Sequence, residues 1–300
     1  MDYFRLKQTY YTGEYKQALK EIESLPVDDT TLFYKGLTLI TLSKYETLTS
    51  SSTEHNDLIE SMDLYSKFIK DKKLIKDLES KIELSSSKPF QLFLLASAKA
   101  INREFDESLN ICVAGIDGDE TLGVPELLLL AIEVSLLNDQ PSVAKTMYDN
   151  YTNNFGDQIN SENELILNLA ESYIKFVTHK DTTTSNFYYF EELAQSFPTW
   201  LTQLSLLNLH LQQKNVIEAE QIISTLESDY YSKEQKDLAA IYYPNLLTAK
   251  IILSSMKAKY DNINDLREEL KKVDPNNSYI KEHDQLNLKF DEVVAKYSSL

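Results

Sequence analysis

The fold of this chain is decided by residues 3–25, which read YFRLKQTYYTGEYKQALKEIESL. Apolar side chains recur at helical spacing on both sides of Gly13, as expected for two short amphipathic helices. Glycine tolerates the left-handed backbone that ends a helix, so Gly13 marks the turn between them. Ala18 is small enough to let the two helices touch, and Tyr15 is placed to wedge between them. The stretch predicts a helical hairpin.

Similar pairs of periodic segments follow the first hairpin along the chain. A hairpin this short cannot bury its apolar face alone, so neighbouring copies are expected to stack into a solenoid. The small residue of the second helix recurs as Ser108, Ala144 and Ala219. Allowing for degenerate copies, this spacing is compatible with the tetratricopeptide period of about 34 residues. We predict an all-α fold, a tetratricopeptide-like, right-handed solenoid of helical hairpins with a C-terminal capping helix.

The predicted domain organisation is one solenoid over 1–300. Its array of helical hairpins is expected to occupy 1–230. The remainder, 231–300, is predicted to hold a C-terminal helix pair and then the capping helix, which begins near Ser278.

The periodic pattern is irregular in several places. A helix predicted from about 31 to 43 contains Gly36, and glycine there costs about 1 kcal/mol relative to alanine, so we expect a close helix crossing to compensate. A short second helix and then a serine loop at 50–53 are expected to follow. Further turns between helices are predicted at 116–120 and 179–185.

The charge balance excludes several classes of ligand. The chain has 30 Lys and Arg against 47 Asp and Glu, a formal net charge of −17. Such a surface repels phosphate backbones and anionic lipid headgroups, so we expect no nucleic acid and no direct membrane ligand. A basic or mainly apolar protein partner fits better. Six glycines and seven prolines also leave little turn chemistry for a β fold.

Cysteine usage and the termini point to the cytosol. Cys112 is the single cysteine, so no disulfide can form within one chain, and its place between Ile111 and Val113 suggests a buried core thiol. The first residues lack the basic start and apolar run of a signal peptide, and no stretch of about twenty apolar residues is present.

No catalytic constellation is recognisable. The six glycines never form a phosphate-binding pattern, and the four histidines do not pair with a second ligand at helical spacing. No acid, base and nucleophile converge in the pattern either. We therefore expect no enzyme activity, no cofactor and no metal site.

The remaining candidate site is the inner surface, which in such arrays is lined by the first helix of each hairpin. An apolar, aromatic groove edged by carboxylates suits an extended or hairpin-shaped segment of a partner protein. Each of these residues has the alternative of packing only between neighbouring helices. The predicted groove residues are Phe33, Leu37, Ile40, Phe90, Phe93, Ser97, Ala100, Leu129, Glu133, Leu136, Leu204, Asn208 and Leu211.

Both ends of the chain resemble one known family. The run DYFRLKQTYYTGEY at 2–15 is similar to its opening hairpin, and the runs YIKE at 279–282 and FDEVVAKY at 290–297 are similar to its closing helix. The family is the epsilon subunit of coatomer, the coat of COPI vesicles, in its fungal form. The resemblance extends over the whole length, and generic tetratricopeptide proteins share the hairpin but not this tail.

The resemblance implies a non-enzymatic scaffold of the COPI coat. Such a subunit binds and stabilises the C-terminal domain of the alpha coatomer subunit, assembles with the other coatomer subunits, and acts in retrograde Golgi-to-ER and intra-Golgi transport. It implies a cytoplasmic protein, peripheral on Golgi membranes and COPI-coated vesicles, that meets the membrane only through the coat. The alternative is another tetratricopeptide adaptor or cochaperone that binds a peptide in its groove. Gripping carboxylate tails, however, needs a Lys and Arg cluster that these positions lack.

Overall fold

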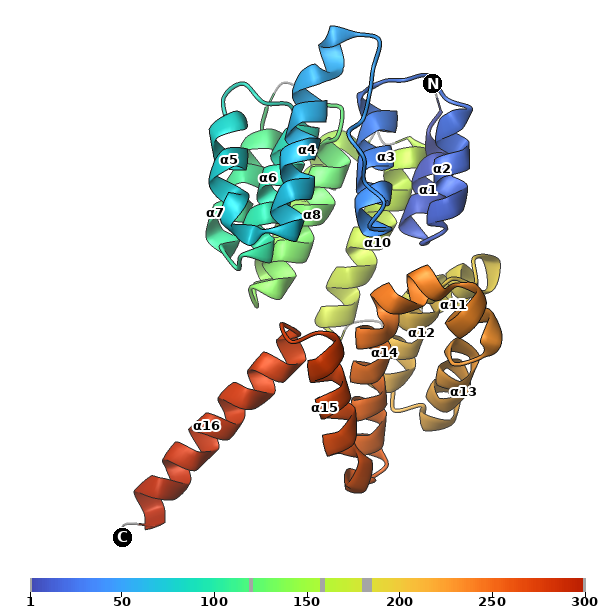
Figure 1. The fold of residues 1–300 in the computed structure, drawn as a ribbon, viewed down its shortest axis with the longest axis vertical. Coiled ribbons are helices and arrows are strands. Elements are labelled where there is room, and N and C mark those ends of the chain that lie inside the picture. The colour runs from blue at the N-terminus through green and yellow to red at the C-terminus, as the bar shows by residue number, and fades with distance from the viewer. Residues whose placement is uncertain (1, 119–120, 157–159, 180–184, 299–300) are drawn as a thin grey trace. The chain divides into compact units, whose positions relative to one another are not determined.

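The computed structural model describes residues 2–118, 121–156, 160–179 and 185–298, and every regular element in these ranges is a helix (Figure 1). The all-α prediction is thus confirmed for the described residues. The chain forms two compact units, residues 1–181 (unit 1) and 182–300 (unit 2). One continuous solenoid over 1–300, with an array in 1–230, stays a prediction.

Unit 1 is built from consecutive helices that pack on their neighbours in the chain. The helix α1 packs on α2, α6 on α7, and α8 on α9, as the hairpin pattern predicts. The last helix, α10, packs on α8 and α9 and also contacts α1, so the beginning and the end of unit 1 lie side by side. The bounds are α1 Phe4–Tyr11, α2 Tyr15–Glu23, α3 Asp29–Thr41, α4 Asn56–Lys70, α5 Ile75–Lys81, α6 Pro89–Ile101, α7 Phe105–Ile116, α8 Val124–Leu137, α9 Pro141–Phe155 and α10 Ser161–Val177.

Unit 2 continues the same construction. In it, α12 packs against α11, α13 and α14, and α14 packs against α15. The helix pair predicted near the C-terminus is found as α14 and α15. The bounds are α11 Ser185–Ser196, α12 Trp200–Gln212, α13 Val216–Leu226, α14 Lys236–Met256, α15 Ile263–Val273 and α16 Ser278–Ser298.

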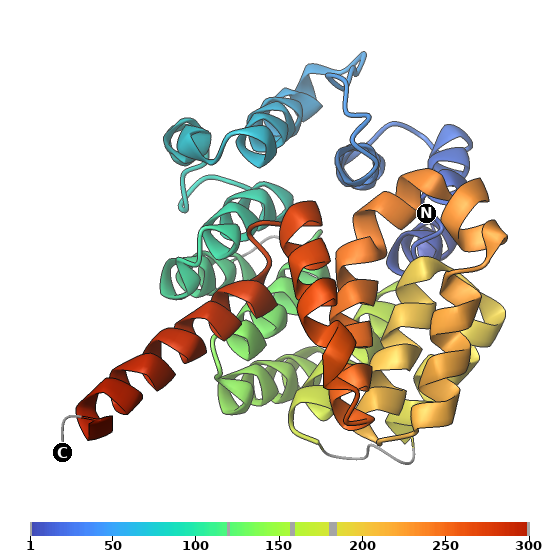
Figure 2. The ribbon, with the colours of Figure 1, turned by 60° about the horizontal axis from the view of Figure 1, so that its bottom comes forward.

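The last helix, α16, begins at the predicted residue, and its apolar packing on unit 2 is found in its first turn. Tyr279 and Ile280 contact the cluster formed by α14 and α15. Farther along, Leu286, Phe290 and Tyr297 are each more than 60% exposed. Figures 1 and 2 both show α16 extending away from α15. That this helix caps the array stays a prediction.

The first helix of most hairpins ends in the same backbone geometry. The second residue after the helix has a positive φ, and the next amide donates to a carbonyl five residues back, for example Glu14 to Thr9 at 2.8 Å and Glu104 to Lys99 at 3.0 Å. Only the first of these turns has glycine in this position. A search of the sequence for glycine therefore finds the turn at Gly13 and none of the others. The residues in this position are Gly13, Ser43, Arg103, Asp139, His179, Lys214 and Ala258.

The predicted small position of the second helix is confirmed as a packing site. Ala18, Ser108, Ala144 and Ala219 are all 0% exposed. The hydroxyl of Ser108 also donates to the Ala96 carbonyl at 2.8 Å, which satisfies its buried polar group. A side chain of this size lets α6 and α7 approach closely.

Gly36 confirms the close crossing predicted for its helix. A Cβ added there would lie 2.7 Å from atoms of the Met62 side chain in α4. Met62 is fully buried. The missing side chain at Gly36 therefore makes room for α4, the helix that packs next to α3.

The short second helix predicted after α3 is wrong. The chain from 42 to 52 contains no helix, and the next α-helix begins at Asn56. Serine and threonine dominate residues 47–53, and these residues have weak helix propensity. Buried Leu48 instead anchors an irregular segment to the core. Residues 119–120 and 180–184 of the two predicted turns lie outside the described residues.

The turn at Gly13 provides a stability test. Gly13→Ala is expected to lower the free energy of unfolding by about 1–2 kcal/mol, because an L side chain is strained at the observed φ of 82°. Gly156→Ala is the matched control, since φ there is −51° and an added Cβ meets nothing within 4 Å. The control should be neutral or stabilise by less than ~1 kcal/mol. Urea unfolding followed by circular dichroism measures both, and equal losses would contradict the assignment.

Candidate partner-binding site

The predicted groove residues fall in both units. Ten belong to α3, α6 and α8 of unit 1, and Leu204, Asn208 and Leu211 belong to α12 of unit 2. Each set is therefore considered within its own unit.

Several of the unit 1 residues form the packing between helices. Phe33 of α3 is 1% exposed and stacks on Phe90 of α6, with ring centroids 4.2 Å apart and an interplanar angle of 17°. The ring of Phe93 meets the ring of Phe33 edge-on, with centroids 5.2 Å apart. Leu37 and Leu129 are also buried. For these buried residues, packing between helices is the observed role.

Other members of the set remain partly accessible. In unit 1 these are Ile40, Phe93, Ala100, Glu133 and Leu136, whereas Ser97 is buried. All five lie on the helices that the sequence assigned to the inner surface, namely α3, α6 and α8. This accessible set is the part of the predicted groove that a partner is able to reach.

In unit 2 the same division holds on a single helix. Leu204 and Leu211 of α12 are 5% and 7% exposed, respectively. Asn208 lies between them in the sequence and is exposed. Of the three residues predicted here, Asn208 is thus the one available for contact.

A buried ion pair ties the first helix of unit 1 to its later helices. The ammonium of Lys7 in α1 lies 2.9 Å from Oε1 of Glu126 in α8, and the two side chains are 7% and 1% exposed. The hydroxyl of Tyr34 in α3 donates to the same oxygen at 2.8 Å. Lys7 also lies 3.8 Å from Oε2 of Glu162 in α10. Four helices therefore meet at one charged group.

Tyrosine rings surround this ion pair. Tyr10 meets Tyr34 edge-on at 5.0 Å and Tyr11 at 5.2 Å. Burial raises the pKa of all three phenols well above the usual value, so they stay neutral. The charge of Glu133 raises the pKa of Tyr10 and Tyr11 further. Burial raises the pKa of Glu133 itself to about 7.

Sequence reasoning missed most of this polar network. Lys7, Tyr34, Glu126 and Glu162 were not among the predicted groove residues. One signal was present, because Glu126 opens an otherwise apolar run and buried carboxylates need partners. The identity of those partners depends on contacts between helices far apart in the chain.

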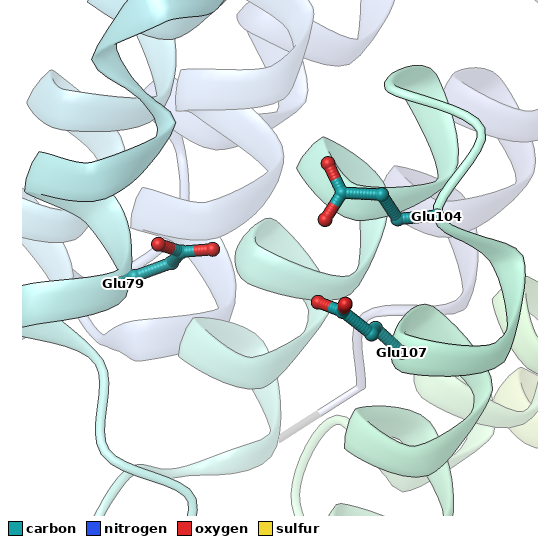
Figure 3. A group of neighbouring side chains, drawn as sticks. All are labelled: Glu79, Glu104 and Glu107. Carbon is teal, nitrogen blue, oxygen red and sulfur yellow. The ribbon is translucent and has the colours of Figure 1, made fainter.

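A group of three carboxylates stands on another face of unit 1. Figure 3 shows Glu79 of α5, Glu104 just before α7 and Glu107 of α7 directed toward one another. The ammonium of Lys99 in α6 lies 2.5–2.6 Å from an oxygen of each. Burial lowers the pKa of Lys99, but hydrogen bonds to the three carboxylates outweigh it and raise that pKa above its usual value. The cluster is thus an ion-pair network around a lysine that joins three helices.

Cys112, His55 and His210 are side chains of chemically reactive types that lie outside the predicted groove. Cys112 is fully buried, as predicted for a core thiol, and burial raises its pKa to about 12. His55 pairs with Asp29 at 2.6 Å, and burial lowers the pKa of His210. None of the helices within the described ranges has both the length and the apolar character needed to cross a bilayer.

Comparison with known proteins gives one extensive similarity. No protein-family model matches the chain. The chain is 51% identical over 301 residues to the curated protein named Coatomer subunit epsilon from Saccharomyces cerevisiae. The match covers 100% of this chain and 99% of that protein. Similarity of this extent includes both units and all sixteen α-helices of the described residues.

The lysine at the centre of the three carboxylates provides a second test. Lys99→Met should lower the free energy of unfolding by about 1–3 kcal/mol, because three neighbouring carboxylates lose their shared cation. Lys145→Met is the control, since Lys145 forms an exposed i,i+4 pair with Asp149 and should change stability by less than ~0.5 kcal/mol. Denaturant unfolding at low salt measures both. An unchanged Lys99→Met variant would show that the network contributes nothing.

Proposed function

This chain belongs to the coatomer epsilon-subunit family, and from that membership we propose that it binds and stabilises the C-terminal domain of the alpha coatomer subunit. As a member of this family it is a structural, non-enzymatic subunit of the COPI vesicle coat. The observation that carries the proposal is the 51% identity, which extends over the full length of both chains. A scaffold that must reproduce a large binding surface is expected to retain similarity over that whole surface.

The proposed cellular role follows from the coat. The chain would act in retrograde Golgi-to-ER and intra-Golgi transport, as a cytoplasmic protein held at the periphery of Golgi membranes and COPI-coated vesicles by the other coatomer subunits. Its formal charge of −17 supports an indirect attachment, because anionic lipid headgroups repel such a surface.

The proposed binding surface is the inner face of the first helices. We propose that the helix pairs stack as a tetratricopeptide-like, right-handed solenoid that continues through 1–300, with α16 as its cap. The turns at Arg103, Asp139, His179 and Lys214 support the assignment, since they repeat about every 35–40 residues, near the tetratricopeptide period of about 34. The accessible groove residues would then contact the alpha subunit, with the aromatic Phe93 as one anchor.

A peptide-binding adaptor or cochaperone is the second candidate, and the charges disfavour it. Gripping a carboxylate tail requires accessible lysine or arginine side chains. The single charged residue among the predicted groove positions is the acidic Glu133. Lys7 of α1 and Lys99 of α6 also lie on first helices of hairpins, but both are buried and paired with carboxylates.

A binding experiment with two purified proteins tests the main proposal. The full chain is mixed with the C-terminal domain of the alpha subunit and analysed by size-exclusion chromatography with light scattering. A stable complex with one copy of each is expected, and the alpha domain should unfold at a higher temperature in the complex. A companion pull-down from cytosol should recover the alpha subunit. Recovery of Hsp70 or Hsp90 tails alone would reject the proposal in favour of the cochaperone.

Two adjacent leucines test the position of the binding surface. Leu136→Asp should weaken binding of the alpha domain by about 10–100-fold, or about 1–3 kcal/mol, because it places a charge in the proposed apolar contact. Leu137→Asp is the matched control, since Leu137 is 70% exposed and was not assigned to the groove. Isothermal titration calorimetry measures the affinities, and circular dichroism verifies the helical content of both variants. Equal affinities would place the binding surface elsewhere.

A further inference from the structure

The helix α8 has two carboxylates, and the first of them contacts α1 of unit 1. Glu126 and Glu133 are seven residues apart, so they lie on the same side of the helix, about 10 Å from one another along its axis. Glu126 meets the Lys7 ammonium at 2.9 Å and the Tyr34 hydroxyl at 2.8 Å. At this level of α8 the protein supplies its own cation.

Glu133 has no such cation. The last residues of α1 are Tyr10 and Tyr11, and the charge of Glu133 raises the pKa of both phenols. Tyr10 and Tyr11 provide neutral phenol groups rather than a positive charge. Within the described part of the chain, no ion pair or hydrogen bond involves the Glu133 side chain.

The cations on the other helices packed against α8 are already paired. Lys99 of α6 is held by its three carboxylates. Lys145 of α9 pairs with Asp149 at 2.7 Å, and Lys175 of α10 pairs with Glu171 at 3.1 Å. The α7 helix contributes the acidic residues Asp106 and Glu107. Desolvation is accordingly the cause of the raised pKa of Glu133.

From this arrangement we infer that the segment of the alpha coatomer subunit bound by unit 1 carries a lysine or arginine that forms an ion pair with the carboxylate of Glu133. The inference rests on the proposed function and names the chemistry of the partner at that same surface. Charge complementarity supports this ion pair, because a carboxylate that is partly removed from water without a partner is unfavourable, and a cation brought by the ligand removes that cost.

The surroundings of Glu133 suit such a side chain. A charged donor forms a short, strong hydrogen bond with a carboxylate. Tyr10, whose pKa is raised by the charge of Glu133, is partly accessible. Leu136, three residues after Glu133 on α8, is partly accessible and apolar, as are the predicted groove residues Ile40 and Phe93. The occupant is thus an extended, mainly apolar segment with one cation.

Titration calorimetry with the full chain and the C-terminal domain of the alpha subunit, at pH 6 and pH 8, tests the inference. In the free protein the pKa of Glu133 is about 7, and pairing with a cation lowers it. Binding therefore favours the ionised form, so affinity should rise about tenfold between pH 6 and pH 8. Proton release on binding at pH 6 should appear as a dependence of the measured heat on the buffer.

Three variants complete the experiment. Glu133→Gln should weaken binding by about tenfold at pH 8 and remove the pH dependence, and Glu133→Lys should weaken binding further by repulsion. Both should keep their helical content, since Glu133 has no partner to lose. Glu23→Gln is the control, because Glu23 is an exposed carboxylate on α2, and it should behave as the unmodified chain.

The outcomes separate this inference from the proposed function. If the unmodified chain and Glu133→Gln bind the alpha domain equally tightly and with the same pH profile, the ion pair at Glu133 is refuted. The proposed complex with the alpha domain is then still supported. If the unmodified chain forms no complex with the alpha domain, both the proposed function and the inference fail. A loss confined to Glu133→Lys would also refute the ion pair, because repulsion alone explains it.

Discussion

The contact between the two helices of a hairpin constrains the rest of this structure. The helices touch at a side chain no larger than serine, as at Ala18, Ser108, Ala144 and Ala219, all of them fully buried. Because each hairpin is too short to enclose its own apolar face, the remaining surface must be covered by the next pair of helices. Stacking of consecutive helices in both units follows from this requirement.

Unit 1 adds a polar constraint to this apolar one. The Lys7–Glu126 pair, supported by Tyr34 and Glu162, links α1 with helices that follow much later in the chain. Removal of one partner from a buried pair typically costs about 3–5 kcal/mol, since the other charge stays unpaired in a dry environment. The pair therefore favours one arrangement of α1, α3, α8 and α10 over alternatives in which these charges are separated. Such specificity suits a scaffold whose surface has to match a partner.

The same helix, α8, connects architecture with recognition. One of its carboxylates, Glu126, pairs with Lys7 inside the protein, and burial raises the pKa of the other, Glu133, to about 7. A coat subunit of the coatomer epsilon family has no substrate to convert, so its specificity depends on the complementarity of surfaces. If the bound segment carries the proposed cation, Glu133 would select that segment and couple its binding to pH.

The sequence by itself determined the helical class, the hairpin unit, the buried small residues and the family, because these depend on local periodicity and on residue order along the chain. It placed the start of α16 at Ser278, as observed. Tertiary structure decided which predicted groove residues stay accessible. Phe33 and Phe90 are buried by stacking on each other, whereas Glu133 stays partly accessible. It also decided the partners of Lys7 and Glu126 and the left-handed turns at residues such as Arg103 and Lys214. These features arise from contacts between segments distant in sequence, or from backbone strain that packing compensates, and neither leaves a local pattern.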